Sequence, residues 1–132
     1  MTFVCFKNFK QKTVYLSKPL SFIQRKYLAK FRLGVLPLCI ETGRYQRPRL
    51  AVEERICKVC NSGEVEDESH FLLRCSLYNI ERQGLIEKLP QPALFSILPD
   101  IEKMETLMND PLIIKSTAQF IIDASDKRSL HL

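Results

Sequence analysis

The chain has 132 residues, a length that accommodates one domain with an additional arm. A hydrophobic content of 45% argues against wholesale disorder, and no apolar run approaches the length of a membrane span. Residues 1–55 carry twelve basic and three acidic side chains, whereas residues 56–132 carry eight basic and twelve acidic ones. The excess of positive charge in the first segment predicts a polyanionic partner, and the acidic remainder predicts a different kind of scaffold.

Residues 1–18 interleave aromatic side chains with lysines. This pattern fits either a nucleic-acid-binding arm or a terminus whose rings dock on the main body. A helix is predicted from Pro19 to Gly34, with an apolar stripe of Leu20, Ile23, Tyr27, Leu28 and Phe31. Its opposite face is cationic and has no balancing acid, so phosphate contact and plain solvation both remain open. The bases of that face are Arg25, Lys26, Lys30 and Arg32.

The segment after this helix, residues 43–49, is basic and extended. Arg44, Arg47 and Arg49 suit bidentate phosphate contact, and Tyr45 is able to stack on a base. The alternative is that Arg44 or Tyr45 packs under the following turn. We predict that the segment and the cationic helix face form a nucleic-acid-binding surface for RNA or DNA.

A Cys-x2-Cys-x9-His-x4-Cys pattern follows, formed by Cys57, Cys60, His70 and Cys75. Three thiols and one imidazole are the ligand set of a tetrahedral structural zinc site, and they fill every position that catalysis would need open. The start of the chain lacks the apolar stretch of a secretory signal, which predicts a reducing intracellular setting, nuclear or cytoplasmic. In that setting clustered Cys and His residues indicate metal rather than disulfides. We therefore predict structural Zn²⁺, a short β-hairpin around it and no enzymatic activity.

Other chemistries for this cluster are less well supported by the surrounding sequence. A redox Cys-x2-Cys pair opens a helix after a strand, a pattern that is missing in this sequence. An iron–sulfur cluster more often takes four thiolates, and a Cys/His nucleophile needs an orienting third group. Cys5 and His131 are possible substitute ligands, but nothing around them favours that role.

Residues 64–68 hold four acids, which suit the first turn of a helix and make the metal turn a poor phosphate-binding face. His70 and Cys75 would lie about 140° apart on a straight α-helix, so we expect a short turn that ends at Cys75. Ser76 then caps a helix over residues 77–89. Pro90, Pro92 and Pro99 predict a linker, followed by helices over about 100–109 and 110–127 that close the core.

With these residues identified, the chain resembles the C-terminal zinc-binding region of reverse transcriptases from non-LTR (LINE-type) retrotransposons. The stretches that carry the resemblance are Lys30 to Leu33, Leu38 to Tyr45, Glu54 to Cys60, Val65 to Tyr78 and Thr117 to Ile121. The resemblance implies that Cys57, Cys60, His70 and Cys75 bind zinc and that the region holds RNA or DNA. The polymerase and endonuclease residues of that family are missing, so catalytic activity is not carried over.

The predicted organisation is a mainly α-helical zinc domain over residues 19–128, with its zinc core over 55–89 and C-terminal helices over 100–127. A basic arm over residues 1–18 precedes it and a frayed tail over 129–132 follows it. The alternative function is a protein-interaction or structural remnant of a truncated retroelement, in which the apolar faces of the C-terminal helices dock a partner.

Overall fold

A computed structural model describes residues 20–132, so the arm over 1–18, Cys5 and Pro19 lie outside the described residues. The described part is mainly α-helical, as predicted. Its helices are α2 (Phe22–Leu33), α3 (Cys39–Thr42), α4 (Asn79–Ile86), α5 (Pro92–Ser96), α6 (Asp100–Asn109) and α7 (Ile114–Leu130). None of these helices is both long enough and apolar enough to cross a membrane.

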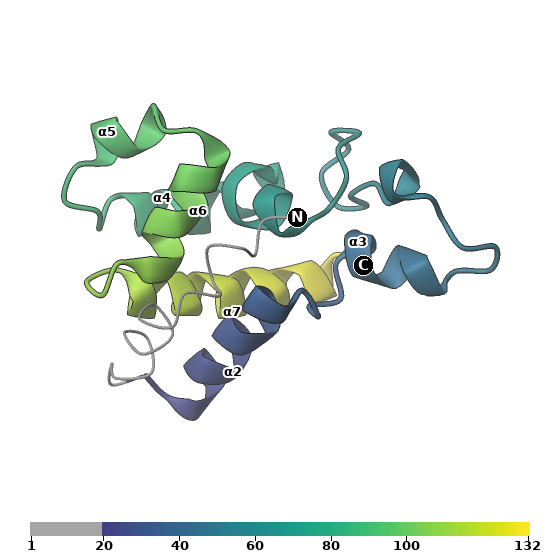
Figure 1. Cartoon of the computed structure of the whole chain (residues 1–132), viewed down its shortest axis with the longest axis horizontal. Coiled ribbons are helices and arrows are strands. Elements are labelled where there is room, and N and C mark those ends of the chain that lie inside the picture. The colour runs from purple at the N-terminus through teal and green to yellow at the C-terminus, as the bar shows by residue number, and fades with distance from the viewer. Residues whose placement is uncertain (1–19) are drawn as a thin grey trace.

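The long helix α7 is the centre of the fold, and α2, α4 and α6 all pack against it (Figure 1). Its buried face carries Ile114, Ala118, Ile121 and Ala124, which recur at helical spacing, so one apolar stripe contacts all three neighbours. Phe120 packs in an aromatic group with Phe71 and Tyr78. These two rings belong to residues 55–89, the predicted zinc core, which is called the metal region below. The metal region is therefore built onto the same core as the helices.

Helix α2 begins at Phe22, where Ser21 and Gln24 form a reciprocal capping box, and it ends before Gly34. Leu20, Leu28 and Phe31 of the predicted stripe are buried. Ile23 is exposed instead, and Gln24 takes the buried position because its amide reaches Gln119 on α7 at 3.3 Å. The helix is thus rotated slightly from the orientation that hydrophobicity alone predicts.

The C-terminal half differs from the prediction at its boundaries. The predicted helix over 77–89 is shorter, because residues 76–78 form a 3-10 turn (η5) before α4, and the Ser76 side chain makes no capping bond. Within the expected proline linker, Pro92 opens the short helix α5. Helix α7 starts after a turn at residues 111–113 and runs to Leu130, so the predicted tail at 129 is partly helical.

The predicted zinc-bound β-hairpin is not present, since the described residues contain no strand. A single antiparallel bridge joins Ile56 to Val65. On one side of it the Cys57 N–H donates to the Glu64 carbonyl (2.9 Å), and on the other the Glu66 N–H donates to the Arg55 carbonyl (3.0 Å). The cysteine turn and the helical turn at residue 68 leave too few residues between them to extend this ladder.

Candidate metal centre

Four side chains from separate parts of the metal region meet at one point. The ligand atoms of Cys57, Cys60, His70 and Cys75 all lie within 4.8 Å of one another. Cys57 Sγ is 3.9 Å from Cys75 Sγ, and Cys60 Sγ is 3.3 Å from His70 Nε2. None of the cysteines within residues 20–132 forms a disulfide. The structure thus brings together the predicted ligand set, and the cluster could hold a metal ion.

The first two ligands lie on a tight turn whose backbone faces the sulfurs. Asn61 and Gly63 both have positive φ, 58° and 78°, and at Gly63 the missing Cβ makes this conformation easy to adopt. The backbone N–H groups of Val59 and Ser62 act to lower the pKa of Cys57 and of Cys60 respectively. Such donors stabilise a thiolate, which is the form that binds metal.

The second pair of ligands is brought together by a π-helical turn, η4 (His70–Arg74). The Cys75 N–H donates to the His70 carbonyl at 2.8 Å, a bond that spans five residues and widens the turn. Cys75 then takes an extended conformation, with φ −61° and ψ 123°. The wider turn and its abrupt end place both ligands on one side, which a straight α-helix would not allow.

Ending the helix here leaves carbonyl groups without their usual partners, and a buried arginine satisfies them. Arg82 Nε donates to the Leu72 carbonyl (2.8 Å) and Nη2 to the Phe71 carbonyl (3.2 Å). Its Nη1 donates to the Asn79 side chain at 2.9 Å. Through these hydrogen bonds Arg82 on α4 stabilises the π-helical turn, and so supports the positions of His70 and Cys75.

The imidazole of His70 is held by a carboxylate on its other side. His70 Nδ1 lies 2.8 Å from Glu64 Oε1, which also accepts from Arg74 Nε at 3.0 Å. Arg74 in turn pairs with Asp100 at the start of α6. A proton on Nδ1 donated to Glu64 leaves the Nε2 lone pair directed at the cysteines, the arrangement found around histidine ligands of metals.

The four acids before His70 do not act as a uniformly charged first turn. Asp67 Oδ1 accepts from the His70 N–H at 2.8 Å and so caps the turn. Glu66 is fully buried and pairs through both oxygens with Arg128 of α7, at 2.7 Å each. Burial alone would raise the pKa of Glu66, but the hydrogen bonds from Arg128 and Cys39 keep it below the usual value. Glu64, Glu66 and Asp67 thus each have a separate structural role, which charge counting did not reveal.

The thiols respond differently to their surroundings. Burial raises the pKa of Cys57, and it raises the pKa of Cys75 to about 12 with the help of the neighbouring thiols. Burial also acts on Cys60, but hydrogen bonds from Ser62 and contacts with Cys57 and His70 outweigh it and lower that pKa to about 6. Cys60 is thus the thiol that deprotonates first, and a bound ion would displace protons from the other two.

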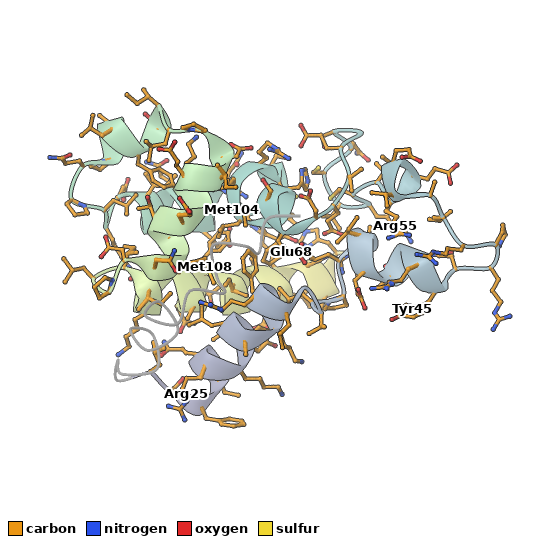
Figure 2. The ribbon with its side chains drawn as sticks, viewed as in Figure 1. Arg25, Tyr45, Arg55, Glu68, Met104 and Met108 are labelled. Carbon is orange, nitrogen blue, oxygen red and sulfur yellow. The ribbon has the colours of Figure 1, made fainter. Side chains whose placement is uncertain are left out.

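The residues predicted to contact nucleic acid fall on two segments, which Figure 2 shows well apart at Arg25 and Tyr45. On α2, Arg25 and Lys26 are exposed, whereas Lys30 and Arg32 are half-buried. Arg25 Nη1 also donates to the Leu20 carbonyl at 2.7 Å. The cationic face of α2 is thus partly used within the fold.

The other segment is the loop between α3 and the metal turn, where all the predicted contact residues are exposed: Arg44, Tyr45, Arg47 and Arg49. Arg44 pairs with Glu41 at 3.2 Å, and its guanidinium carbon lies 5.7 Å from the centre of the Tyr45 ring. Neither side chain packs under the metal turn.

A residue that sequence analysis missed, Arg55, holds the base of this loop. Its Nη1 donates to the Ile40 carbonyl (2.9 Å), and both Nε and Nη2 donate to the Leu50 carbonyl (3.2 and 3.0 Å). Gly43 lies directly against it, since a Cβ there would come within 2.5 Å of Arg55 Cγ. Because Arg55 immediately precedes the metal turn, the same residue is hydrogen-bonded to the loop and adjacent in sequence to the metal ligands.

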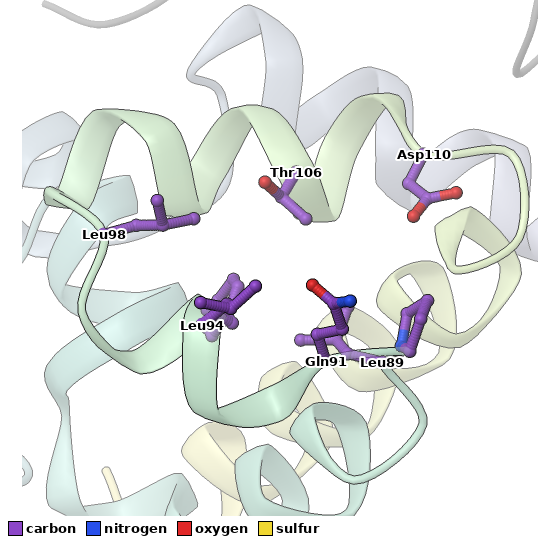
Figure 3. A pocket seen from close by; sticks show the side chains of 8 residues that line it. Leu89, Gln91, Leu94, Leu98, Thr106 and Asp110 are labelled. Atoms are coloured by element: carbon purple, nitrogen blue, oxygen red, sulfur yellow. The ribbon is translucent and has the colours of Figure 1, made fainter.

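An apolar groove of about 240 Å³ lies away from both segments, between α5 and α6 (Figure 3). Leu89 and Leu94 lie on one side of it, and Leu98, Thr106 of α6 and Asp110, the residue after the end of α6, lie on the other. Leu94 is 54% exposed and the adjacent Ile97 is 76% exposed. The groove is therefore one of the places where the C-terminal helices expose apolar surface to solvent.

No protein-family model, curated protein or solved structure matches this chain.

Proposed function

We propose that the chain is a non-enzymatic, nucleic-acid-binding module in which a structural zinc ion positions a basic loop. The observation that carries the proposal is that Arg55 is hydrogen-bonded both to the basic loop and to the metal turn. Its side chain closes the loop over residues 43–50, and its backbone carbonyl accepts from Glu66 across the metal turn. A metal ion that orders the turn also orders Arg55, and through it the exposed arginines.

Zinc is the ion that best fits the cluster. In a tetrahedron with typical zinc bond lengths, two sulfurs lie about 3.8 Å apart, and a sulfur and a nitrogen about 3.6 Å apart. The corresponding separations of 3.9 Å and 3.3 Å are close to these values. Thiolate and imidazole ligands favour zinc over magnesium or calcium, and four protein ligands support a structural rather than a catalytic role.

Single-stranded RNA is the partner that the loop suits best. Tyr45 is 70% exposed, and a ring in that position is available for stacking on an unpaired base. Arg47 and Arg49 are exposed beside it and supply phosphate contacts. The resemblance of the chain to the zinc-binding region of LINE-type reverse transcriptases supports the same assignment.

Fluorescence anisotropy with labelled single-stranded RNA at several salt concentrations tests this function. Each phosphate contact contributes about 0.7 to the slope of log K against log salt, so replacing Arg47 and Arg49 by alanine lowers the slope by about 1.4. Lys88→Ala with Lys115→Ala is the matched control, because both lysines are exposed outside the two basic segments. Equal slopes for the two double variants, or no binding at low salt, would refute the proposal.

The second candidate is a protein-interaction module, and the apolar groove between α5 and α6 is the observation that favours it. In that case Leu94→Asp weakens partner binding while RNA binding is absent. If RNA binds and Leu94→Asp leaves the affinity unchanged, the nucleic-acid function holds.

A further inference from the structure

A second pocket lies where α2 packs against α7 (Figure 1), between α2, the loop that follows it and the last turns of α7. Its volume is about 160 Å³. At about 30 Å³ for each water, this space equals roughly five waters, which is comparable to one planar nucleobase. Helix α7 forms one wall because it continues to Leu130 instead of fraying from residue 129.

The charged groups of this pocket do not pair with one another. Lys30 and Asp126 both line it, but no ion pair joins them within the described residues. The Lys30 ammonium lies instead 5.9 Å from the centre of the Tyr27 ring. A ligand that accepts a hydrogen bond from the ammonium and donates one to the carboxylate would connect the two charges.

Arg128 supplies a donor that the fold leaves unused. The residue is 7% exposed, and its Nε and Nη2 both donate to Glu66 at 2.7 Å. Its Nη1 makes no hydrogen bond within the described residues, and it is not one of their fully buried unpaired atoms. Because Arg128 lines the pocket, Nη1 is the group that it offers to a ligand. A guanidinium donor that is largely withdrawn from water gains a strong hydrogen bond from an acceptor there.

We propose that this pocket binds a guanine base of single-stranded RNA, an inference that rests on the proposed function. Guanine carries two adjacent acceptors, O6 and N7, and two adjacent donors, N1–H and the N2 amino group. The acceptors suit the ammonium of Lys30 and Nη1 of Arg128, and the donors suit the two oxygens of Asp126. Adenine, cytosine and uracil each lack the pair of adjacent donor groups.

The surroundings of the pocket supply the other parts of an RNA site. Tyr27 and the buried side chains of Leu36 and Leu38 present apolar surface to the base. Arg25 and Lys26 precede Tyr27 on α2 and are exposed, so they are available to the phosphates of neighbouring nucleotides. Along the chain, the pocket loop lies between the cationic face of α2 and the basic loop.

Fluorescence anisotropy of the zinc-loaded full chain with four oligouridine RNAs tests this inference. Their central nucleotide is guanosine, inosine, 7-deazaguanosine or uridine. Inosine lacks the N2 amino group and 7-deazaguanosine lacks N7, so each loses one charge-assisted hydrogen bond and should bind about tenfold more weakly than guanosine. Equal affinity for the guanosine and uridine RNAs would overturn the guanine pocket and leave the proposed function standing. No binding of any of the four at low salt would refute the proposed function, and the pocket with it.

Asp126→Asn tests whether the preference belongs to this pocket. The side chain is exposed, so the change is compatible with the fold, and an amide cannot accept from both guanine donors. The variant should bind the guanosine and inosine RNAs within about twofold of each other. Asp123→Asn is the matched control, because it removes the same charge from an exposed position of α7 outside the pocket and should keep the wild-type preference.

Two results would overturn the inference at this stage. One is a preference for guanosine over inosine that survives in Asp126→Asn, since the base would then be recognised elsewhere. The other comes from competition with guanosine monophosphate, which distinguishes a base within RNA from a free nucleotide. Tighter binding of the monophosphate than of the guanosine RNA would identify the free nucleotide as the ligand, whereas weaker binding supports the RNA base.

Discussion

The carboxylate behind His70 offers a sharp test of how the metal centre is built. Glu64 Oε1 is 2.8 Å from His70 Nδ1, where it fixes the tautomer that leaves Nε2 free for a metal. Loss of such a partner weakens metal binding about 10- to 100-fold. The Glu64 side chain is 46% exposed, so water replaces it in part and the lower end applies. We expect Glu64→Ala to weaken zinc binding about tenfold, or about 1.4 kcal/mol.

Competition with a chromogenic zinc chelator at fixed pH measures this change. Glu53→Ala is the control, because it removes the same charge from an exposed position four residues before Cys57. Glu64→Gln keeps an oxygen that accepts from Nδ1–H and retains most of the affinity. A Glu64→Ala protein within twofold of the wild type, or an equal loss in Glu53→Ala, would show that the carboxylate does not support the ligand.

Three further predictions concern the supports of the site. Arg128→Met leaves the buried carboxylate of Glu66 without its cation. We expect the free energy of unfolding, measured by denaturant titration, to fall by about 3–5 kcal/mol, and a loss below about 1 kcal/mol would contradict this. Gly43→Ala forces a Cβ against Arg55 and destabilises the chain by about 1–3 kcal/mol, measured in the same way, whereas an unchanged midpoint would show that the contact relaxes freely. In metal-free protein at pH 7, Cys60, with its pKa lowered to about 6, reacts with iodoacetamide before buried Cys39, whose pKa is raised to about 11 by burial; peptide mapping that finds the reverse order would refute the lowered pKa.

Features that depend on nearby residues were predictable from sequence. The ligand spacing and the end of α2 before Gly34 each follow from residues within a few turns of one another. The expectation that the segment after His70 must end at Cys75 also followed from geometry, because five residues cannot place two ligands on one side of a straight α-helix. The π-turn is the specific form that this constraint takes.

Features that depend on distant partners were not predictable. Glu66 and Arg128 are 62 residues apart, so neither the charge pattern nor helical periodicity indicated a buried pair. The clamp by Arg55 depends on two carbonyls that no sequence rule singles out. The β-hairpin prediction was wrong because the metal turn needs only one bridge, between Ile56 and Val65, to bring its ligands together.

Occupancy of the Cys57, Cys60, His70 and Cys75 cluster by one zinc ion, which we propose orders the basic loop, can be measured by elemental analysis of protein purified under reducing conditions. Cys75→Ser is the comparison. We expect one zinc per wild-type chain and a large loss of zinc in the variant, accompanied by a lower melting temperature. Wild-type protein that neither retains zinc nor takes it up when zinc is supplied would refute the proposed metal centre.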